Sequence, residues 1–297
     1  MEAMGSRRDF LTTAAAAAVP LAALAMSGNR PAAQRPGLLE GRNAVIYGAA
    51  GAIGGAVSRA FAREGAQVFL AGRTFEKVEA LAKELSQCGA RASAAAVDAL
   101  DRAAVEKHLE DVVRMAGAID ISFNLIGLGG EQGESLTDMT FDAFDVPIGH
   151  AMRTHFLTAT AAGRHMAKRG SGVIMALTAQ VARKPYTGSG GFGVACAAIE
   201  GLCRQLAIEL GTHGVRVVTL RSSGSPDAPG VAEAIALHAR SAGVTLEAFE
   251  ARIAVKTMLK RMPKMAEIAN AAVLMASDRA SAITAAVTNA TCGEIAD

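Results

Sequence analysis

The feature that most constrains the fold of this chain is a glycine-rich turn between an apolar run and a helical stretch. The apolar run covers residues 43–48 and is typical of a buried strand, and residues 52–64 have helical character. Between them, Gly48, Gly51 and Gly54 let a backbone pass close to a ligand, because glycine has no Cβ. The sequence therefore predicts a first strand, a tight turn and a first helix.

A turn of this kind is suited to binding a phosphate group. The helix that follows presents free N–H groups and the positive end of its dipole at its N-terminus. Because the turn follows the first predicted strand and opens the first predicted helix, its context favours a dinucleotide ligand. The alternative is a glycine-rich turn that binds nothing.

Strands and helices alternate along the rest of the chain, which implies a parallel sheet with right-handed crossovers. The strands lack a polar alternate face, as expected when helices cover both sides of a sheet. The predicted strands are residues 43–48, 67–71, 91–97, 119–126, 172–177, 215–220 and 283–291. The predicted helices are residues 52–64, 75–87, 102–116, 140–169, 190–211 and 263–277. The fold class is therefore α/β, with a Rossmann-type, doubly wound, parallel sheet of seven strands in a single domain over residues 43–297.

One long stretch, residues 222–262, interrupts this alternation and reads as irregular. It leaves the carboxyl end of a predicted strand, and such segments border the ligand crevice of an open α/β sheet. We interpret it as a substrate-covering segment.

Composition excludes several classes of function. The apolar share of 51% excludes disorder as the dominant state. The net charge of only +2 and the lack of tryptophan disfavour nucleic acid as a partner. The four cysteines follow no metal-ligand spacing, so no metal site and no disulfide scaffold is predicted.

The N-terminus resembles a twin-arginine export signal. Arg7 and Arg8 precede a weakly apolar run that ends in a small-x-small sequence, so residues 1–25 are predicted to direct export to the periplasm. The run is too short to predict an integral membrane span. Residues 26–42 are expected to be a linker. The alternative is that translation starts at Met26, which would give a cytoplasmic protein.

The end of the second predicted strand bears on the choice of cofactor. A site that prefers NAD usually places a carboxylate there to bind the ribose 2′-hydroxyl, but this chain has Arg73 and Thr74 and no carboxylate before Glu76. Arginine binds a 2′-phosphate through charge-assisted hydrogen bonds, so NADP(H) is the predicted cofactor. The alternative is that Arg73 is an ordinary surface residue.

From about Gly41 to its end, the chain resembles a short-chain dehydrogenase/reductase. The family motif TGxxxGxG is similar to residues 47–54, with Ala52 in place of the middle glycine, and the family motif NNAG is half preserved at residues 124–127. The resemblance implies a small-molecule substrate and a homodimer or homotetramer formed through the helices at 140–169 and 190–211. The implied and predicted cofactor-binding residues are Gly48, Gly51, Ile53, Gly54, Arg73, Thr74, Asp98, Ala99, Asn124 and Gly127.

The catalytic residues of the family do not match. The family uses a serine to hold the substrate oxygen and a tyrosine, its pKa lowered by a lysine, to exchange the proton. This chain has Ala179, Phe192 and Cys196 at those positions, and Ala151 near the position of the family asparagine. The ordinary proton relay is therefore absent.

Other groups could replace it. Thr178 is predicted to hydrogen-bond a substrate oxygen, with a packed strand residue as the alternative. Tyr186 lies in the loop after the fifth strand and is predicted to be a displaced acid, with a loop tyrosine at the core edge as the alternative. Weaker candidates are Lys184, Cys196, His150, His155 and Ser222.

Three functions follow from this pattern. The first is an NADP(H)-dependent reductase of carbonyl or enoyl groups with a non-standard proton donor. The second is a protein that binds NADP(H) without redox turnover, as a sensor or partner subunit. The third is a non-redox lyase, cyclase or isomerase built on the same fold.

Overall fold

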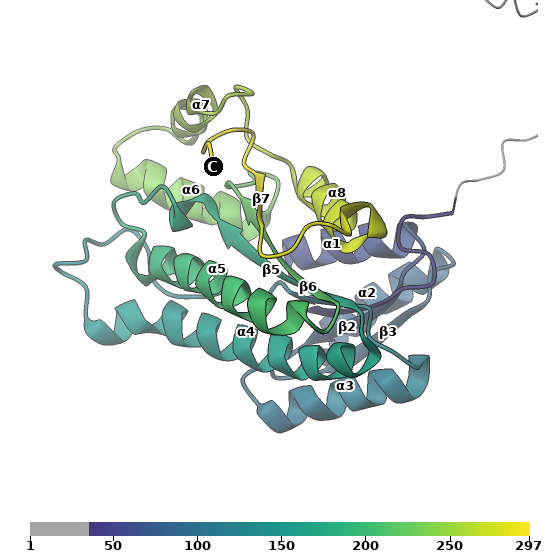
Figure 1. Ribbon diagram of the computed structural model, residues 1–297. Coiled ribbons are helices and arrows are strands. Elements are labelled where there is room, and N and C mark those ends of the chain that lie inside the picture. Colours follow the sequence, from purple (N-terminus) through teal and green to yellow (C-terminus); the bar gives the residue numbers. More distant parts are fainter. Residues whose placement is uncertain (1–35) are drawn as a thin grey trace, which may run out of the picture. The chain divides into compact units, whose positions relative to one another are not determined.

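The apolar runs of the chain form one parallel sheet, seen in the computed structural model, which describes residues 36–297 (Figure 1). The strands are β1 Asn43–Tyr47, β2 Gln67–Gly72, β3 Ala92–Ala96, β4 Ile121–Asn124, β5 Gly172–Ala179, β6 Val215–Ser222 and β7 Val287–Ala290. Their order in space is β3-β2-β1-β4-β5-β6-β7, and every neighbouring pair is parallel. The predicted seven-stranded, doubly wound α/β fold is confirmed.

Eight α-helices accompany the sheet within residues 36–297. They are α1 Ala52–Arg63, α2 Phe75–Gln87, α3 Arg102–Ala116, α4 Phe141–Arg169, α5 Gly190–Gly211, α6 Pro229–Ser241, α7 Leu246–Lys256 and α8 Met265–Ala276. One face of the sheet packs against α1, α2 and α8, and the other packs against α3, α4 and α5. Alternate residues of one strand serve the two cores, since Ile46 faces the first and Val45 the second.

The direction of winding changes between β1 and β4. From β1 the chain runs outward to β2 and β3, then returns to β4 on the other side of β1. In open α/β sheets, ligands bind at such a switch point, beyond the carboxyl ends of the strands. The fold therefore brings the ends of β1, β2 and β4 to the expected cofactor site.

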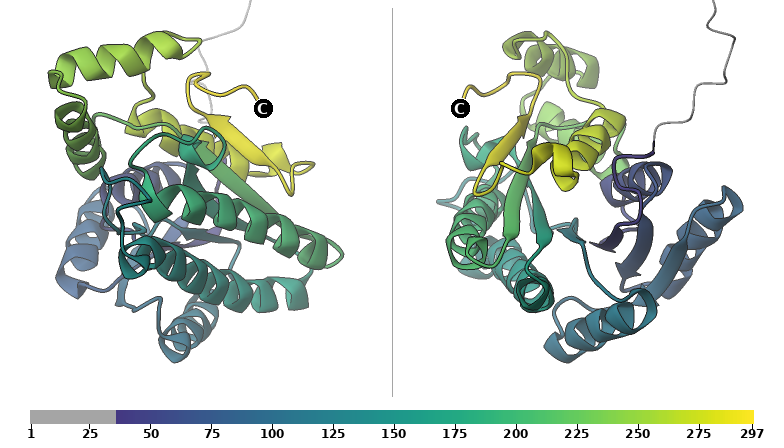
Figure 2. Two further views of the ribbon diagram at one scale, coloured as in Figure 1. Left: turned by 90° about the vertical axis from the view of Figure 1, so that its left-hand side faces the viewer. Right: turned by 45° about the vertical axis from the view of Figure 1, so that its right-hand side comes forward.

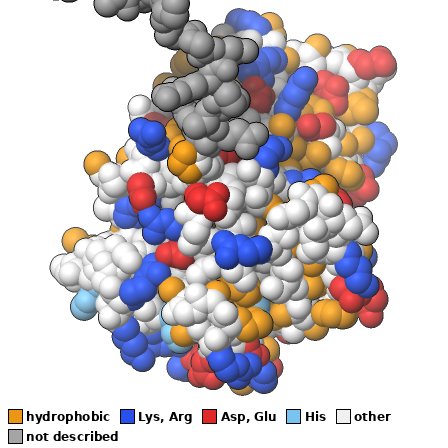
Figure 3. Space-filling view, turned by 90° about the vertical axis from the view of Figure 1, so that its right-hand side faces the viewer, with side chains coloured by type: hydrophobic (Ala, Val, Ile, Leu, Met, Phe, Trp, Pro, Cys, Tyr) orange, Lys and Arg blue, Asp and Glu red, His pale blue; other side chains and the backbone are white. Residues whose placement is uncertain are grey.

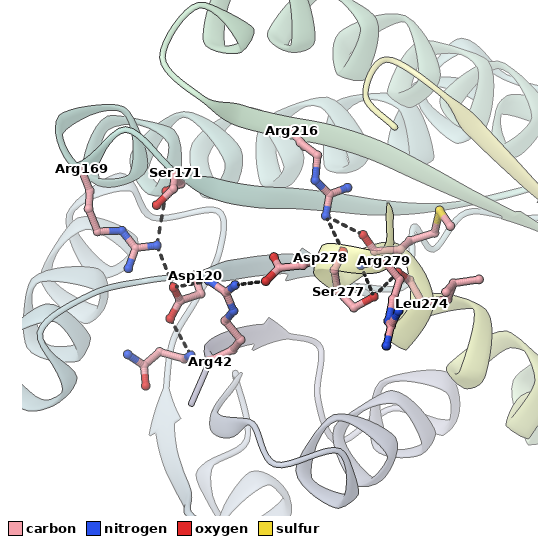
Figure 4. Close-up of polar contacts among 11 residues, drawn as sticks. Arg42, Asp120, Arg169, Ser171, Arg216, Leu274, Ser277, Asp278 and Arg279 are labelled. Carbon is pink, nitrogen blue, oxygen red and sulfur yellow. Dashed lines mark hydrogen bonds and ion pairs between the residues drawn. The ribbon is translucent and has the colours of Figure 1, made fainter. Parts of the chain in front are cut away.

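The opposite, amino-terminal edge of the sheet is closed by charged side chains (Figure 4). The buried carboxylate of Asp120 accepts hydrogen bonds from the Asn43 amide at 2.8 Å and from Arg169 at 2.7 Å. Arg216 donates to the carbonyl oxygens of Met275 at 2.9 Å and Ser277 at 3.1 Å. These bonds fix the starts of the strands to α4 and α8, and they leave the carboxyl ends to the candidate site.

Residues 222–262 differ from the expectation of an irregular segment. They contain α6 and α7, so that part of the interpretation is wrong. Pro229 begins α6, where its missing N–H costs no hydrogen bond, and a run rich in alanine continues the helix. α6 buries only Ile235 and Ala239, and α7 buries no residue. Figure 2 shows the two helices, in light green, standing near the C-terminus.

The predicted export signal, residues 1–25, and the first part of the predicted linker lie outside the described residues. Within the remainder of the linker, Leu39 is buried, and its amide donates to the Glu64 carbonyl oxygen at 2.9 Å. Among the described helices, only α5 is long and apolar enough to cross a membrane by length and composition. Its buried face, which includes Glu200, packs in the core.

Candidate functional site

The glycine turn after β1 is shaped so that side chains do not fit. Gly48 has a φ of +72°, and a Cβ there would lie 2.7 Å from the Leu125 carbonyl oxygen. A Cβ at Gly54 would lie 2.2 Å from the Gly48 carbonyl oxygen. The turn therefore requires glycine at both positions, and it brings bare backbone to the end of β1.

The N-terminus of α1 follows this turn and has free hydrogen-bond donors. Gly51 precedes the helix and provides no side-chain cap, and the first turn, which includes Ile53, contains no acidic residue. Uncapped amides at a helix N-terminus bind anions. A cradle that any Cβ would fill, facing these amides, fits the pyrophosphate of a dinucleotide.

The ends of β2 and β3 place charged side chains beside this turn. Arg73 and Thr74 are exposed after β2, and Asp98 is exposed after β3, next to the buried Ala99. The pKa of His150 on α4 is lowered by its partial burial and by the charge of Arg73, and the charge of Asp98 opposes both effects. Arg73 and Asp98 are therefore close enough to share one electrostatic environment, as a site for the adenosine end of the cofactor requires.

The end of β4 completes the predicted cofactor set. The Asn124 side chain is buried, accepts from the Ile126 amide at 3.0 Å and donates to Thr158 Oγ1 at 3.2 Å. Asn124 thus shapes the chain that leaves β4. Gly127 is exposed, and a Cβ there would meet open space, so nothing within the described fold requires glycine at this position.

The positions at which the family resemblance predicts the catalytic groups hold side chains that pack. Cys196 on α5 is buried, which raises the pKa of its thiol to about 12, and Glu200 one turn further adds to that rise. The thiol is therefore neutral at physiological pH and supplies no positive charge. Ala179 and Phe192 are partly buried against the same core.

Thr178 is held inside the protein. Its hydroxyl donates to Glu200 Oε1 at 3.0 Å, and Glu200 forms a buried ion pair with Arg221 on β6, at 2.8 Å for both of its hydrogen bonds. Arg221 also donates to the Asp297 side chain. The single hydroxyl hydrogen of Thr178 is thus engaged by a structural partner, and no hydrogen bond joins Thr178 to Tyr186 within the described chain.

Tyr186 lies in the loop after β5 with 37% of its surface exposed. Its hydroxyl donates to Gln132 Oε1 at 3.4 Å, and its ring meets the His238 ring edge to face, with centroids 5.2 Å apart. Burial, Cys196 and Glu294 together raise the pKa of Tyr186 to about 12. The Tyr186 hydroxyl is therefore protonated at physiological pH.

Three residues of this region have no signal in the sequence. They are Gln132 in the loop after β4, His238 on α6 and Glu294 near the C-terminus. Glu294 accepts from Ser223 Oγ at 2.8 Å and pairs with Lys184 at 3.6 Å. Their positions follow no motif spacing, so only the folded chain brings them together.

The two candidate histidines of α4 lie elsewhere. His155 is buried, its Nδ1 lies 2.9 Å from the Ala151 carbonyl oxygen, and burial lowers its pKa to about 4. It is thus neutral at physiological pH. His150 lies toward Arg73, at the cofactor side.

The molecular surface adds one observation about partners. On the face drawn in Figure 3, lysine and arginine side chains are mixed with aspartate and glutamate and form no continuous basic surface. Within residues 36–297, no group of three or more histidine, cysteine, aspartate or glutamate side chains could hold a metal ion.

Comparison with known proteins gives consistent matches. The family model described as enoyl-(acyl carrier protein) reductase matches residues 48–293. The chain is 29% identical over 248 residues to the uncharacterized oxidoreductase YxbG of Bacillus subtilis, covering 84% of this chain and 89% of that protein. Among solved structures, it is similar to sorbitol-6-phosphate 2-dehydrogenase SrlD from Erwinia amylovora, with a TM-score of 0.81 and 25% identity over 86% of this chain and 100% of the other. NAD+-bound xylitol dehydrogenase shares the fold, with a TM-score of 0.80 and 21% identity over 86% of this chain and 99% of the other.

Proposed function

The chain belongs to the short-chain dehydrogenase/reductase superfamily as an oxidoreductase, and on that premise we propose an NADP(H)-dependent reductase of carbonyl or enoyl groups in which Tyr186 donates the proton. The observation that carries the proposal is that the Tyr186 hydroxyl, in the partly exposed loop after β5, is held only by a long hydrogen bond to Gln132 Oε1 at 3.4 Å. The chain has two tyrosines, and the other, Tyr47, is fully buried. Tyr186 is therefore the tyrosine available to a substrate.

The environment of Tyr186 sets the expected strength of this acid. A pKa of about 12 keeps the hydroxyl protonated at physiological pH, so it is always ready to donate. The same pKa makes it a weaker acid than a tyrosine beside a free lysine, and Lys184 nearby shares its charge with Glu294. We expect slow turnover for this reason.

NADP(H) is the cofactor that the charges favour. The glycine turn and the start of α1 would hold the pyrophosphate, and Arg73 would bind a 2′-phosphate. When bound, the reduced nicotinamide supplies the hydride. NAD(H) is the alternative, since the structurally similar xylitol dehydrogenase was crystallised with NAD+.

The test compares two tyrosine variants of the chain that begins at Met26. Calorimetry with NADPH and NADH establishes cofactor binding, and a panel of carbonyl and enoyl compounds then measures turnover. Tyr186→Phe should lower turnover about 100-fold, as expected for the loss of a general acid, while Tyr47→Phe should retain it.

Other outcomes support the competing functions. Unchanged turnover in Tyr186→Phe removes Tyr186 from the mechanism. Tight NADPH binding without turnover of any compound favours a binding protein without redox activity. Product formed without net oxidation of NADPH favours a lyase, cyclase or isomerase, and Thr178 would then be tested as a substrate-binding group.

We also propose that residues 1–25 direct export to the periplasm, supported by Arg7 and Arg8 ahead of the apolar run. Cell fractionation tests this proposal. Lysine at both arginine positions should abolish the periplasmic form. A cytoplasmic location of the unaltered protein would instead favour translation from Met26.

Assembly is a further part of the proposal. Exposed apolar side chains on α4 and α5, including Phe156 and Ile208, support a homodimer or homotetramer formed through these two helices. Light scattering of Phe156→Glu and of the unaltered protein would test it, with a smaller assembly expected for the variant.

A further inference from the structure

Three segments far apart in the sequence meet at the side chain of Gln132. The loop after β4 carries Gln132, the loop after β5 carries Tyr186, and α6 carries His238. The two loops are joined next to Gln132 by the Gly133 amide, which donates to the Gly188 carbonyl oxygen at 2.7 Å. The position of Gln132 is thus set by backbone contacts on one side, while its side chain points between two aromatic rings.

The amide oxygen of Gln132 is the acceptor for both rings. His238 Nε2 lies 3.1 Å from Gln132 Oε1, and the Tyr186 hydroxyl lies 3.4 Å from the same oxygen. The Tyr186 contact is longer than an ordinary O–H···O bond, so it is weak and readily exchanged, whereas the His238 contact has the length of an ordinary N–H···O bond. A carbonyl oxygen therefore already occupies the space between two hydrogen-bond donors that come from different segments.

Gln132 Oε1 thus provides an acceptor for both donors at this partly exposed site. An amide oxygen resembles the oxygen of a ketone or an aldehyde in shape and in its lone pairs. We infer that Gln132 Oε1 marks the position of the substrate's carbonyl oxygen, and that Tyr186 and His238 form the donor pair that binds this oxygen after Gln132 is displaced. This inference rests on the proposed function, because the reduction of the carbonyl group is part of that proposal.

The pair performs the role of two donors to a developing oxyanion. When bound, a reduced nicotinamide would supply a hydride from one of its own C–H bonds and become oxidised. The carbonyl carbon would gain the new C–H bond, and the C=O π pair would move onto oxygen. That oxygen takes the proton of Tyr186 and becomes a hydroxyl, and the tyrosinate left behind regains a proton from water. His238 donates from Nε2 throughout, which limits the substrate to one with an oxygen at this point.

The groups around His238 leave it neutral. Its ring faces Tyr186 from the loop after β5 and Gln132 from the loop after β4, and partial burial lowers its pKa. A neutral imidazole with its hydrogen on Nε2 donates one hydrogen bond and needs no further proton.

The test uses cyclohexanone as the carbonyl probe and begins without cofactor. The His238 ring resonance, assigned by its loss in His238→Gln, is followed by NMR during titration and gives the dissociation constant. Cyclohexanone should shift this resonance. Tyr186→Phe and His238→Phe should each weaken binding about fivefold, through loss of one hydrogen bond. His238→Gln, which keeps a donor, should recover part of that loss, and His213→Gln, at an exposed position, should change nothing.

Gln132→Leu is the decisive variant. If Gln132 only stands in for the substrate, its removal frees both donors and should tighten cyclohexanone binding about threefold. If Gln132 is a structural link, its removal should weaken binding as much as His238→Phe, and that result overturns the inference. An unshifted His238 resonance in the unaltered protein overturns it as well.

Turnover separates this inference from the proposed function. NADPH-dependent reduction of cyclohexanone that Tyr186→Phe abolishes and His238→Phe leaves unchanged would keep the function and overturn the donor pair. Binding that follows the expected pattern, with no reduction of any carbonyl or enoyl compound, would keep the oxygen site and overturn the reductase.

Discussion

The two halves of the sheet differ in which part of the chain forms their sites. From β1 to β4 the candidate cofactor site consists mainly of backbone, with Gly48 and Gly54 required by close contacts of their own. From β5 to the C-terminus the candidate catalytic site consists of side chains, and Ala179, Phe192 and Cys196 occupy the positions at which the family resemblance predicts the three catalytic groups. A site made of backbone is tied to the fold, whereas a site made of side chains can change while the fold remains.

The residues at these predicted positions pack in the core. Ala179, Phe192 and Cys196 are apolar or nearly so, and all three contact the core shared by α3, α4 and α5. Meanwhile β6 and α5 carry a buried ion pair one helical turn beyond Cys196, between Arg221 and Glu200. In the catalytic half, these predicted positions therefore contribute to packing, and a buried ion pair lies one helical turn away.

The largest expected effect is on the free energy of unfolding. It compares the buried ion pair of Glu200 and Arg221 with an exposed ion pair in the cofactor half of the sheet. Glu200→Gln leaves Arg221 buried and only partly compensated, so it should lower the free energy of unfolding by about 3 kcal/mol. Glu84→Gln breaks the exposed pair with Arg59 and should cost less than about 1 kcal/mol. Urea unfolding of both variants measures the difference, and equal losses would contradict the distinction between the two halves.

The next effect concerns the backbone cradle. Gly54→Ala places a Cβ 2.2 Å from the Gly48 carbonyl oxygen, so the turn must shift and NADPH affinity should fall about 100-fold, or about 2.7 kcal/mol. Gly211→Ala adds a Cβ in open space and should bind normally. Calorimetry measures both affinities, with circular dichroism to show that each variant is folded. Full affinity in Gly54→Ala would mean that the turn does not form the cofactor site.

A smaller effect concerns the pH dependence of stability. The folded pKa of His155 is about 4, below its ordinary value of 6.5, so the unfolded chain takes up a proton first as the pH falls. Stability is therefore lost from about pH 6.5 downward, until the folded form is also protonated near pH 4, and the loss from pH 7 to pH 5 should be about 2 kcal/mol.

His155→Gln should remove this part of the pH dependence, and His213→Gln, at an exposed position, should retain it. Urea unfolding at pH 7 and at pH 5 provides the measurement. If both variants lose the same free energy of unfolding between pH 7 and pH 5, His155 is not the group that causes this loss.

The smallest effect concerns the choice of nucleotide. Arg73→Ala removes a charge-assisted contact to a 2′-phosphate, so NADPH affinity should fall about tenfold, or about 1.4 kcal/mol, while NADH affinity stays unchanged. Arg63→Ala, at an exposed position in the last turn of α1, is the matched control. Equal losses for both nucleotides would refute the assignment of NADP(H).

The sequence by itself determined the sheet, the six helices that cover its two faces and the glycine turn. These features have local signals in the sequence. A short stretch such as residues 215–220 shows the apolar pattern of a buried strand, and the glycines at the end of β1 show the backbone freedom that a tight turn needs. The helices of 229–256 escaped this reading, since they follow a run of turn-forming residues at 222–230 and bury only two residues between them.

Only the tertiary structure decided which side chains meet. Gln132 and Tyr186 are 54 positions apart, Gln132 and His238 are 106 positions apart, and no spacing in the chain links them. The buried partner of Thr178 was equally hidden, because Glu200 lies on a different element. Such contacts depend on how loops and helices pack across the carboxyl end of the sheet. That packing is a property of the whole fold and not of any short stretch of sequence.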